Sequence, residues 1–233
     1  MNFTKTVSCV TRYMDRFYYL KQALPTWLIF PYDEIIIVDW SSKDNDLVPY
    51  IRELNDARIK IVQVPEQQYF NQGASWNTGV RYASSEFIQG IDCDTIFFPR
   101  AYEHVLPIED NKFYTGLPNT HTHGTALFSK SAWTKVSGFT EIFKTWSQDD
   151  VLFYKSLEQA GYRRELSFTD YEIKHIDHDD TIRFKHHEIK MSQPDAINYN
   201  IQEELKSIDK VKGMKIYAAN VYGWKNNEFV CSA

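Results

Sequence analysis

Two aspartates stand one residue apart in the segment GIDCDT, where an apolar run ends. In an extended strand Asp92 and Asp94 point to the same side, because alternate side chains share a face. Two like charges that lie so close repel each other unless a partner neutralises them. A solvated turn, an internal base or a divalent cation would each neutralise or solvate the pair, and the DxD pattern alone does not distinguish these alternatives.

A second acidic pair, Asp149 and Asp150, lies in the segment WSQDDVLF. Ser147 is expected to cap the helix that follows, and Asp150, three residues later, completes a pattern typical of a capping box. Capping explains Asp150, but it explains neither the neighbouring Trp146 nor the second aspartate. The other interpretation is that Asp150 is a general base next to an aromatic side chain.

Histidines and aspartates gather in the segment KHIDHDDTIRF. The imidazoles of His175 and His178, together with the nearby carboxylates, suit Mn²⁺, Fe²⁺ or Zn²⁺. A solvated loop is the alternative. Asp39 also has two interpretations: it follows the apolar run EIIIV, and it either caps the next turn through Ser41 and Ser42 or accepts hydrogen bonds from a base or ribose.

These polar residues follow strands that alternate with helices in the first half of the chain. The expected strands lie in TVSCVT, DEIIIVDWSS, RIKIVQV and EFIQGIDCDTIFF, and the expected helices in FYYLKQALPTWL, LVPYIRELN and GASWNTGVRYASS. The alternation predicts an α/β fold with an open, mostly parallel, twisted sheet flanked by helices. Because ligands of such sheets bind beyond the carboxyl ends of the strands, we expect Thr11, Arg12, Asp39 and the Asp92–Asp94 pair to meet at one edge.

Bulk composition excludes several classes of protein. The net charge of −5 and the pI of about 5.8 argue against a polybasic surface for nucleic acid. Three cysteines without a CxxC pair indicate a reduced compartment, so we expect a cytoplasmic protein. No apolar stretch of about 18 residues is present, and we therefore expect neither a secretory signal nor a membrane span.

Three segments together resemble the family 2 type of GT-A glycosyltransferase, over roughly residues 5–185. EIIIVDWSSKDN is similar to the family's EiiivDdgSxD, and NQGASWNTGVRYASSEFIQGIDCD is similar to its (R)N-x-G…A…(l)D-x-D segment, with Trp76 in place of the Arg before Asn77. GTALFSKSAWTKVSGFTEIFKTWSQDDVLFYKSLEQAG resembles a longer and more specific motif that contains WxxED, with Asp149 in place of Glu. That motif is similar to the branch of β4-galactosyltransferase, polypeptide N-acetylgalactosaminyltransferase and chondroitin polymerase.

The resemblance implies an inverting, metal-dependent transfer of a sugar from a UDP-sugar to an acceptor hydroxyl. Asp94 and His175, or alternatively His178, are expected to hold Mn²⁺ or Mg²⁺, and Asp150 to be the catalytic base. Asp39 is expected to recognise uracil, and Asp92 to contact ribose or a metal-bound water. The residues expected to bind the donor or the acceptor are Thr11, Arg12, Asp39, Asn77, Asp92, Trp146 and Asp149.

The resemblance also implies a domain organisation. We expect a GT-A catalytic domain over residues 1–185, with a nucleotide-binding half (1–94) and an acceptor half (95–185). Residues 186–233 are expected to form an extension with a helical tail, packed on the same domain. The acceptor is expected to be a glycan or another hydroxyl compound, and nucleic acid is not excluded as an acceptor.

Two other functions are compatible with paired aspartates on an α/β fold. A nucleotidyltransferase usually has a Gly-rich basic loop after its first strand, and the segment CVTRYMDR contains none. A non-catalytic sugar-binding module derived from the fold would not need Asp94, Asp150 and His175 together.

Overall fold

The computed structural model describes residues 3–146, 148–192, 194–196, 198–199 and 215–232. Its strands are β1 (Val7–Tyr13), β2 (Glu34–Asp39), β3 (Ile59–Gln63), β4 (Phe87–Asp92), β5 (Thr95–Phe97), β6 (Lys112–Gly116), β7 (Ala126–Ser129), β8 (Arg163–Phe168), β9 (Ile173–His175), β10 (Asn220–Lys225) and β11 (Glu228–Ser232). Its helices are α1 (Phe17–Trp27), α2 (Leu47–Leu54), α3 (Gln72–Tyr82), α4 (Lys130–Lys135), α5 (Asp149–Gln159) and α6 (Asp180–Phe184).

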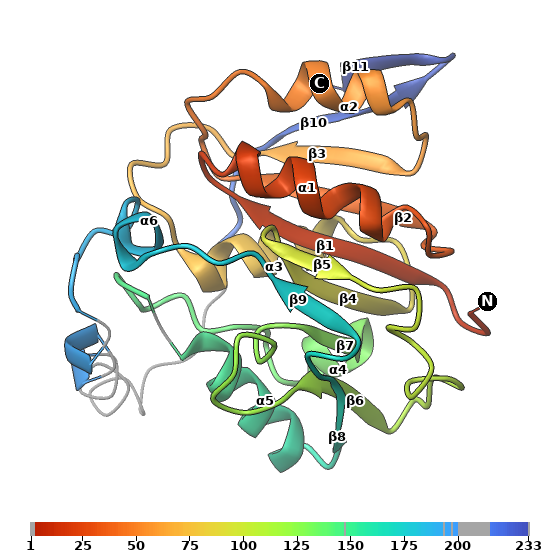
Figure 1. Cartoon of the computed structure of the whole chain (residues 1–233), viewed down its shortest axis with the longest axis vertical. Helices are drawn as coiled ribbons and strands as arrows, with labels where there is room; N and C mark the ends of the chain where they lie inside the picture. The colour runs from red at the N-terminus through yellow and green to blue at the C-terminus, as the bar shows by residue number, and fades with distance from the viewer. Residues whose placement is uncertain (1–2, 147, 193, 197, 200–214, 233) are drawn as a thin grey trace.

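A mixed sheet runs through the described part of the chain, in the order β11-β10-β3-β2-β1-β4-β7-β6-β8 (Figure 1). Strands β3, β2, β1 and β4 are parallel and form its centre. Every residue of β2 is buried, because helices cover both faces, and this is the reason for its unbroken apolar run. The α/β fold with a mostly parallel central sheet is therefore confirmed.

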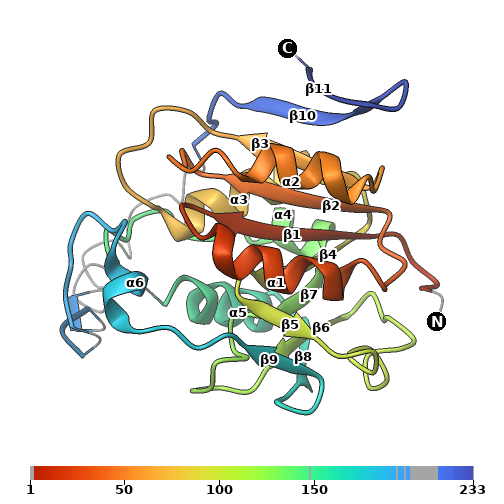
Figure 2. The ribbon, with the colours of Figure 1, turned by 45° about the horizontal axis from the view of Figure 1, so that its top comes forward.

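Two hydrophobic layers cover the faces of the sheet. Cys9 and Tyr13 of β1 pack in one layer with α1 and α2, whereas Val10 packs in the other layer with α3, α4 and α5. Figure 2 shows α1 and α2 in front of the sheet and α3 and α4 behind it. Helix α3 lies close to the sheet at Gly79, where a Cβ atom would be 2.4 Å from Val10 Cγ1. This close packing holds α3 against β1 and β2.

A short antiparallel pair, β5 and β9, brings two distant segments together. Thr95 lies opposite His175 in this pair, and the Ile176 N–H donates to the Asp94 carbonyl at 2.7 Å. The indole N–H of Trp27 donates to the Thr95 carbonyl at 2.8 Å, which ties the pair to α1. The pair therefore places the histidine-rich segment next to the DxD segment.

The second half of the sheet is built from antiparallel additions and one parallel pair. Strand β7 pairs antiparallel with β4 and β6, and β8 pairs parallel with β6. Helix α5 has Gln148 at its N-cap and ends before Gly161, whose φ is +94°. Ser147, the expected cap, lies outside the described residues. Asp149 and Asp150 thus occupy the first turn, where a helix favours negative charge.

The described end of the C-terminal extension is a β-hairpin that was not predicted, and residues 194–196 and 198–199 before it are helical. Strand β10 pairs antiparallel with the outer edge of β3, and β11 pairs with β10. Asn226 and Asn227 both have positive φ, as a tight two-residue hairpin turn requires. Residues 200–214, which include most of the segment expected to be helical, lie outside the described residues. Among the helices described, none is both long enough and apolar enough to cross a lipid bilayer.

Candidate active site

A cavity of about 450 Å³ lies at the carboxyl edge of the central strands. It is lined by the end of β1, the end of β4, the segment after β9 and the first turn of α5. The fold therefore brings together most of the residues that the sequence analysis assigned to the site. Those that line the cavity are Arg12, Asp92, Asp94, Trp146, Asp149, Asp150, His175 and His178.

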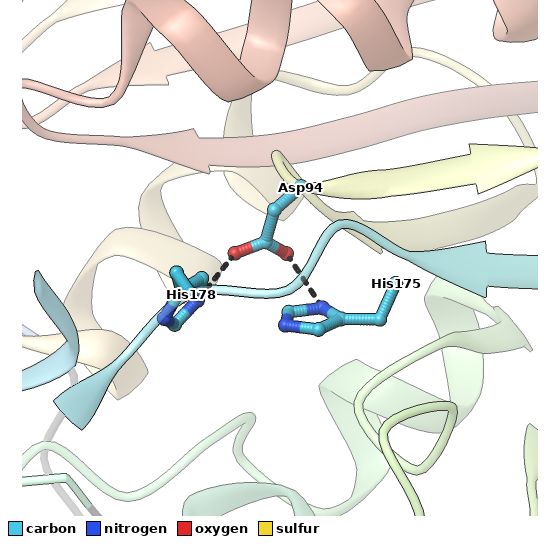
Figure 3. Close-up of side chains that lie close together, drawn as sticks. All are labelled: Asp94, His175 and His178. Carbon is cyan, nitrogen blue, oxygen red and sulfur yellow. Dashed lines mark hydrogen bonds and ion pairs between the residues drawn. The ribbon is translucent and has the colours of Figure 1, made fainter.

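Asp94, His175 and His178 form a group that could hold a metal ion (Figure 3). One ligand atom from each residue lies within 4.8 Å of the others. Asp94 Oδ1 is 3.4 Å from His175 Nδ1, and Asp94 Oδ2 is 3.1 Å from His178 Nε2. Among the described residues, the buried Nε2 atom of His175 has no hydrogen-bond partner. One carboxylate and two imidazoles fit a first-row divalent cation, and an unpaired imidazole nitrogen is a suitable ligand atom.

Arg16 reaches the same group from the start of α1, and the sequence analysis gave it no role. Its Nη1 atom is 2.9 Å from Asp94 Oδ2 and 3.3 Å from His178 Nε2. Burial opposes the ionisation of Asp94, but hydrogen bonds from His175 and His178 and the charge of Arg16 outweigh it and lower the pKa of Asp94. Asp94 is therefore a carboxylate at neutral pH, as a metal ligand must be.

Arg12 connects four elements beneath the cavity. Its guanidinium pairs with Asp92 of β4, and its Nη1 atom is 3.9 Å from Asp149 Oδ2 at the start of α5. Its Cζ atom is 4.3 Å from the centre of the Trp76 ring in α3. The indole of Trp76 thus supports Arg12, and this nearly buried charge gains two carboxylate partners.

The pKa of Asp150 is strongly shifted by the surroundings of its carboxyl group. Its Oδ1 atom accepts a hydrogen bond from the Val151 N–H at 2.7 Å, and its Oδ2 atom is 3.5 Å from His123 Nδ1. Burial, with a smaller contribution from the charge of Asp92, raises the pKa of Asp150 to about 6, against the effect of the Val151 N–H. A carboxylate with such a pKa is suited to accept a proton near neutral pH.

Six of the seven histidines of the chain line this cavity, although only two were predicted to do so. The other four are His121, His123, His186 and His187. Burial lowers the pKa of His187 to about 3 and is the main reason that the pKa of His123 falls to about 4, so both rings are neutral at ordinary pH. The segments HTH and KHH were the only signals in the sequence, and short histidine pairs are common on loops.

Asp39 and Thr11 were expected to bind the donor, but neither lines the cavity. Asp39 Oδ1 accepts a hydrogen bond from the Ser42 N–H at 2.8 Å, and Oδ2 accepts one from Gln63 Nε2 at 3.1 Å. This is the turn-capping arrangement that was the alternative interpretation of Asp39. Thr11 is fully buried in β1.

Asn77, also expected to bind the donor, is fully buried and lies away from the cavity. Its amide donates to the Phe139 carbonyl at 2.8 Å and to Glu141 Oε1 at 2.9 Å. Its Oδ1 atom accepts hydrogen bonds from the Phe139 N–H at 2.8 Å and the Trp133 indole at 3.1 Å. These contacts use its whole hydrogen-bonding capacity, and they fix the segment after α4 against α3.

Solved structures with a similar fold include several glycosyltransferases. The Drosophila β1,4-galactosyltransferase 7 in complex with xylobiose has a TM-score of 0.65 at 15% identity, and the alignment covers 97% of this chain and 91% of that one. A mutant of the same enzyme in complex with manganese, UDP-Gal and xylobiose has a TM-score of 0.58 at 16% identity, with 91% and 82% covered. At such identities the similarity shows the shared fold alone.

Two microbial structures match a smaller region. The mannosyltransferase PcManGT from Pyrobaculum calidifontis, in complex with GDP-Man and Mn²⁺, has a TM-score of 0.60 at 15% identity, with 72% of this chain and 56% of that chain covered. The S. aureus TarS has a TM-score of 0.57 at 14% identity, with 70% and 60% covered. This chain therefore spans less than two thirds of the length of either structure.

A search of curated protein sequences gives no significant match. The model of glycosyl transferase family 2, by contrast, matches residues 19–168, which extend from α1 through α5 to the end of β8. Because this match extends over more than half of the chain, the protein belongs to glycosyl transferase family 2.

Proposed function

We propose that this protein is an inverting glycosyltransferase that uses a divalent cation, Mn²⁺ or Mg²⁺, to move a sugar from a UDP-sugar to an acceptor hydroxyl. One observation carries the proposal: a single cavity holds both the Asp94–His175–His178 group and Asp150, whose pKa is raised to about 6. The first group suits a metal ion and the second suits a general base. Direct sugar transfer from a nucleoside diphosphate is promoted by both functions.

Asp94, His175 and His178 are the residues proposed to hold the cation. When bound, the cation supplies the positive charge that makes a nucleoside diphosphate a good leaving group. Arg16, 2.9 Å from Asp94, and Arg12, paired with Asp92, add positive potential on the same side of the cavity. Because Asp92, Asp94 and Asp149 offset these two charges, the bound cation is needed to make this wall attractive to a diphosphate.

Asp150 is the proposed catalytic base. Its Oδ1 atom is already held by the Val151 N–H, so Oδ2 is the atom proposed to take the proton of the acceptor hydroxyl. The acceptor oxygen then attacks the anomeric carbon while the diphosphate leaves from the opposite face. A single displacement of this kind inverts the configuration at that carbon.

The remaining donor and acceptor contacts are assigned to residues at the cavity. We propose that Asp92 contacts the ribose and that Trp146 and Asp149 contact the donor sugar or the acceptor, as the resemblance to the WxxED branch implies. Arg183 Cζ lies 5.7 Å from the centre of the Trp146 ring and extends this wall. Thr11, Asp39 and Asn77 are proposed to support the site from inside the fold, because their side chains are buried away from the cavity.

A binding experiment tests the metal and the nucleotide together. We expect UDP to raise the melting temperature of the protein when Mn²⁺ is present and to have little effect without it, because a ligand stabilises the state that binds it. The Asp94→Ala variant should lose this Mn²⁺-dependent stabilisation. Asp110→Ala is the matched control, since Asp110 is a surface aspartate that pairs with Lys5 far from the cavity.

Calorimetry with UDP and GDP decides between donor classes. Binding of UDP by the wild type and the control variant, but not by Asp94→Ala, supports the proposal. Tighter binding of GDP than of UDP would overturn the UDP assignment. Unchanged Mn²⁺-dependent affinity of Asp94→Ala for UDP would overturn the metal site.

A further inference from the structure

His123 lies beside the proposed base and has no part in the function described so far. It belongs to the loop between β6 and β7, and its Nδ1 atom is 3.5 Å from Asp150 Oδ2. Both side chains are largely buried, with 17% of His123 and 23% of Asp150 exposed. Catalytic hydrogen bonds are often this long in a ligand-free protein and shorten when the substrate binds.

Tyr154 fixes His123 next to Asp150. The Tyr154 hydroxyl donates to the His123 carbonyl at 2.9 Å, and the two rings meet edge to face with their centres 5.4 Å apart. Tyr154 lies four residues after Asp150 on α5, so the two side chains share one face of the helix. The helix that carries the base therefore also holds the loop that carries the imidazole.

The charge and the tautomer of His123 follow from its surroundings. Burial, with a smaller effect from the positive charge of Arg164, lowers the pKa of His123 to about 4, so the ring is neutral at ordinary pH. A neutral imidazole has one N–H, and the nitrogen that faces a carboxylate must carry it, because two acceptors repel each other. In this geometry a neutral His123 can pair with the ionised Asp150 only as a donor.

We propose that His123 is a positioning residue that donates a hydrogen bond from Nδ1–H to Asp150 Oδ2 and orients this carboxylate toward the acceptor. The proposal rests on the proposed role of Asp150 as the base. The Val151 N–H holds Oδ1, and a hydrogen bond from His123, whose Nδ1 is 3.5 Å from Oδ2, would fix the other end of the carboxylate. A second lone pair of Oδ2 remains for the proton of the acceptor hydroxyl.

Other charged groups from every neighbouring element also act on this pair. Asp92 from β4 and Arg12 from β1 act on Asp150, and Arg164 from β8 acts on His123. Asp149 and the neutral Tyr154 of α5 lie next to them. The experiment therefore changes only His123 and keeps these groups in place.

The pairing is tested without any substrate, by following the carboxyl carbon of Asp150 with NMR in protein labelled at aspartate. The signal of Asp150 is identified by its loss in the Asp150→Asn variant. Removal of a donor that stabilises the ionised carboxylate should raise the pKa of Asp150 by about one unit in His123→Ala. His123→Gln, which keeps an N–H donor but does not titrate, should restore the wild-type value within about 0.3 units.

His104→Ala is the matched control, because His104 is exposed and does not line the cavity. Circular dichroism confirms equal folding of the variants before titration. A pKa of Asp150 that is the same in His123→Ala and the wild type would overturn the proposal.

Turnover of UDP-galactose with Mn²⁺ supplies the functional measurement. We expect His123→Ala to lower kcat about tenfold with little change in KM, and His123→Gln to recover most of the loss. A raised pKa of Asp150 in His123→Ala, together with wild-type turnover by Asp150→Asn, would show that the contact exists but that Asp150 is not the base. That result would overturn the positioning role and the proposed function, whereas the contact between His123 and Asp150 would remain supported.

Discussion

The presence of Asp150 in the first turn of α5 has two explanations, and a single substitution distinguishes them. If Asp150 only favours the helix terminus, Asp150→Asn should lower the free energy of unfolding by no more than about 1 kcal/mol and leave turnover unchanged. If it is the base, the amide keeps the shape but cannot accept a proton, and turnover should fall roughly 10²–10⁴-fold. We expect the second result, measured as sugar transfer or donor hydrolysis at matched folded concentration, with UDP binding retained.

The raised pKa of Asp150 also predicts how activity depends on pH. The base must be ionised, and burial raises its pKa from 3.8 to about 6. The ratio kcat/KM should therefore rise as the pH increases through about 6 and be small at pH 4.5, where an ordinary aspartate would still be ionised. A profile that is flat from pH 5 to 8, for a reaction limited by chemistry, would contradict the assignment.

The two histidines of the metal-binding group should both be required. The sequence resemblance favours His175, whereas the structure places His178 equally near Asp94, at 3.1 Å against 3.4 Å. We expect His175→Ala and His178→Ala each to weaken Mn²⁺ binding by about tenfold or more, as seen when the surroundings of metal sites are changed. Isothermal titration with Mn²⁺ measures this, with His104→Ala as the control. Wild-type affinity in either variant would remove that histidine from the site.

For single residues, the sequence indicated which side chains could do chemistry better than it predicted their contacts. The acidic pairs and the KHIDH segment were visible because several chemically active side chains stand close together along the chain. The internal hydrogen bonds of Asp39 and Asn77 depend on partners such as Gln63 and Phe139, which lie 24 and 62 residues away. A local pattern contains no information about such partners.

Among the loops and strands, the approach of the β6–β7 loop to β4 depends on Gly124. A Cβ atom at this position would be 2.6 Å from Asp92 Oδ2, the carboxylate that pairs with Arg12. We expect Gly124→Ala to displace Asp92, weaken Mn²⁺-dependent UDP binding severalfold, and lower the free energy of unfolding by about 1–3 kcal/mol. Urea unfolding and calorimetry measure the two effects.

Gly223→Ala is the control for this substitution. A Cβ atom there would meet Lys60 Cγ at 3.9 Å, which is ordinary contact. Equal losses in the two variants would mean that the effect does not come from Asp92.

Regular elements were predictable where hydrophobic periodicity is strong. The unbroken apolar run of β2 indicated a strand covered on both faces, and that strand is present. The hairpin of β10 and β11 was missed, because its pairing with β3 joins Val221 to Val62 across most of the chain. The adjacent asparagines at 226 and 227 were a local signal for the turn, but the aromatic stretch before them was assigned to no element.

For the molecule as a whole, the C-terminal hairpin covers an edge of the sheet that would otherwise be open. Phe229 is buried in the layer of α1 and α2, and it contacts the rings of Tyr222 and Trp224. We expect Phe229→Ala to lower the free energy of unfolding by about 3–5 kcal/mol in urea, and Phe229→Leu by much less. Equal and small effects of both variants would indicate that the hairpin is not part of the cooperative core.

The contact of Arg16 with Asp94 and His178 has a consequence for how the protein would acquire the proposed cation. The guanidinium of Arg16 already neutralises the Asp94 carboxylate at 2.9 Å, so the metal-free protein does not hold an uncompensated charge at this position. If the cation binds through this carboxylate, loading would exchange one positive charge for another, and the measured affinity would be a difference between two competing partners. A guanidinium released from Asp94 would then lie beside the cavity, where the phosphates of the donor need a counter-charge.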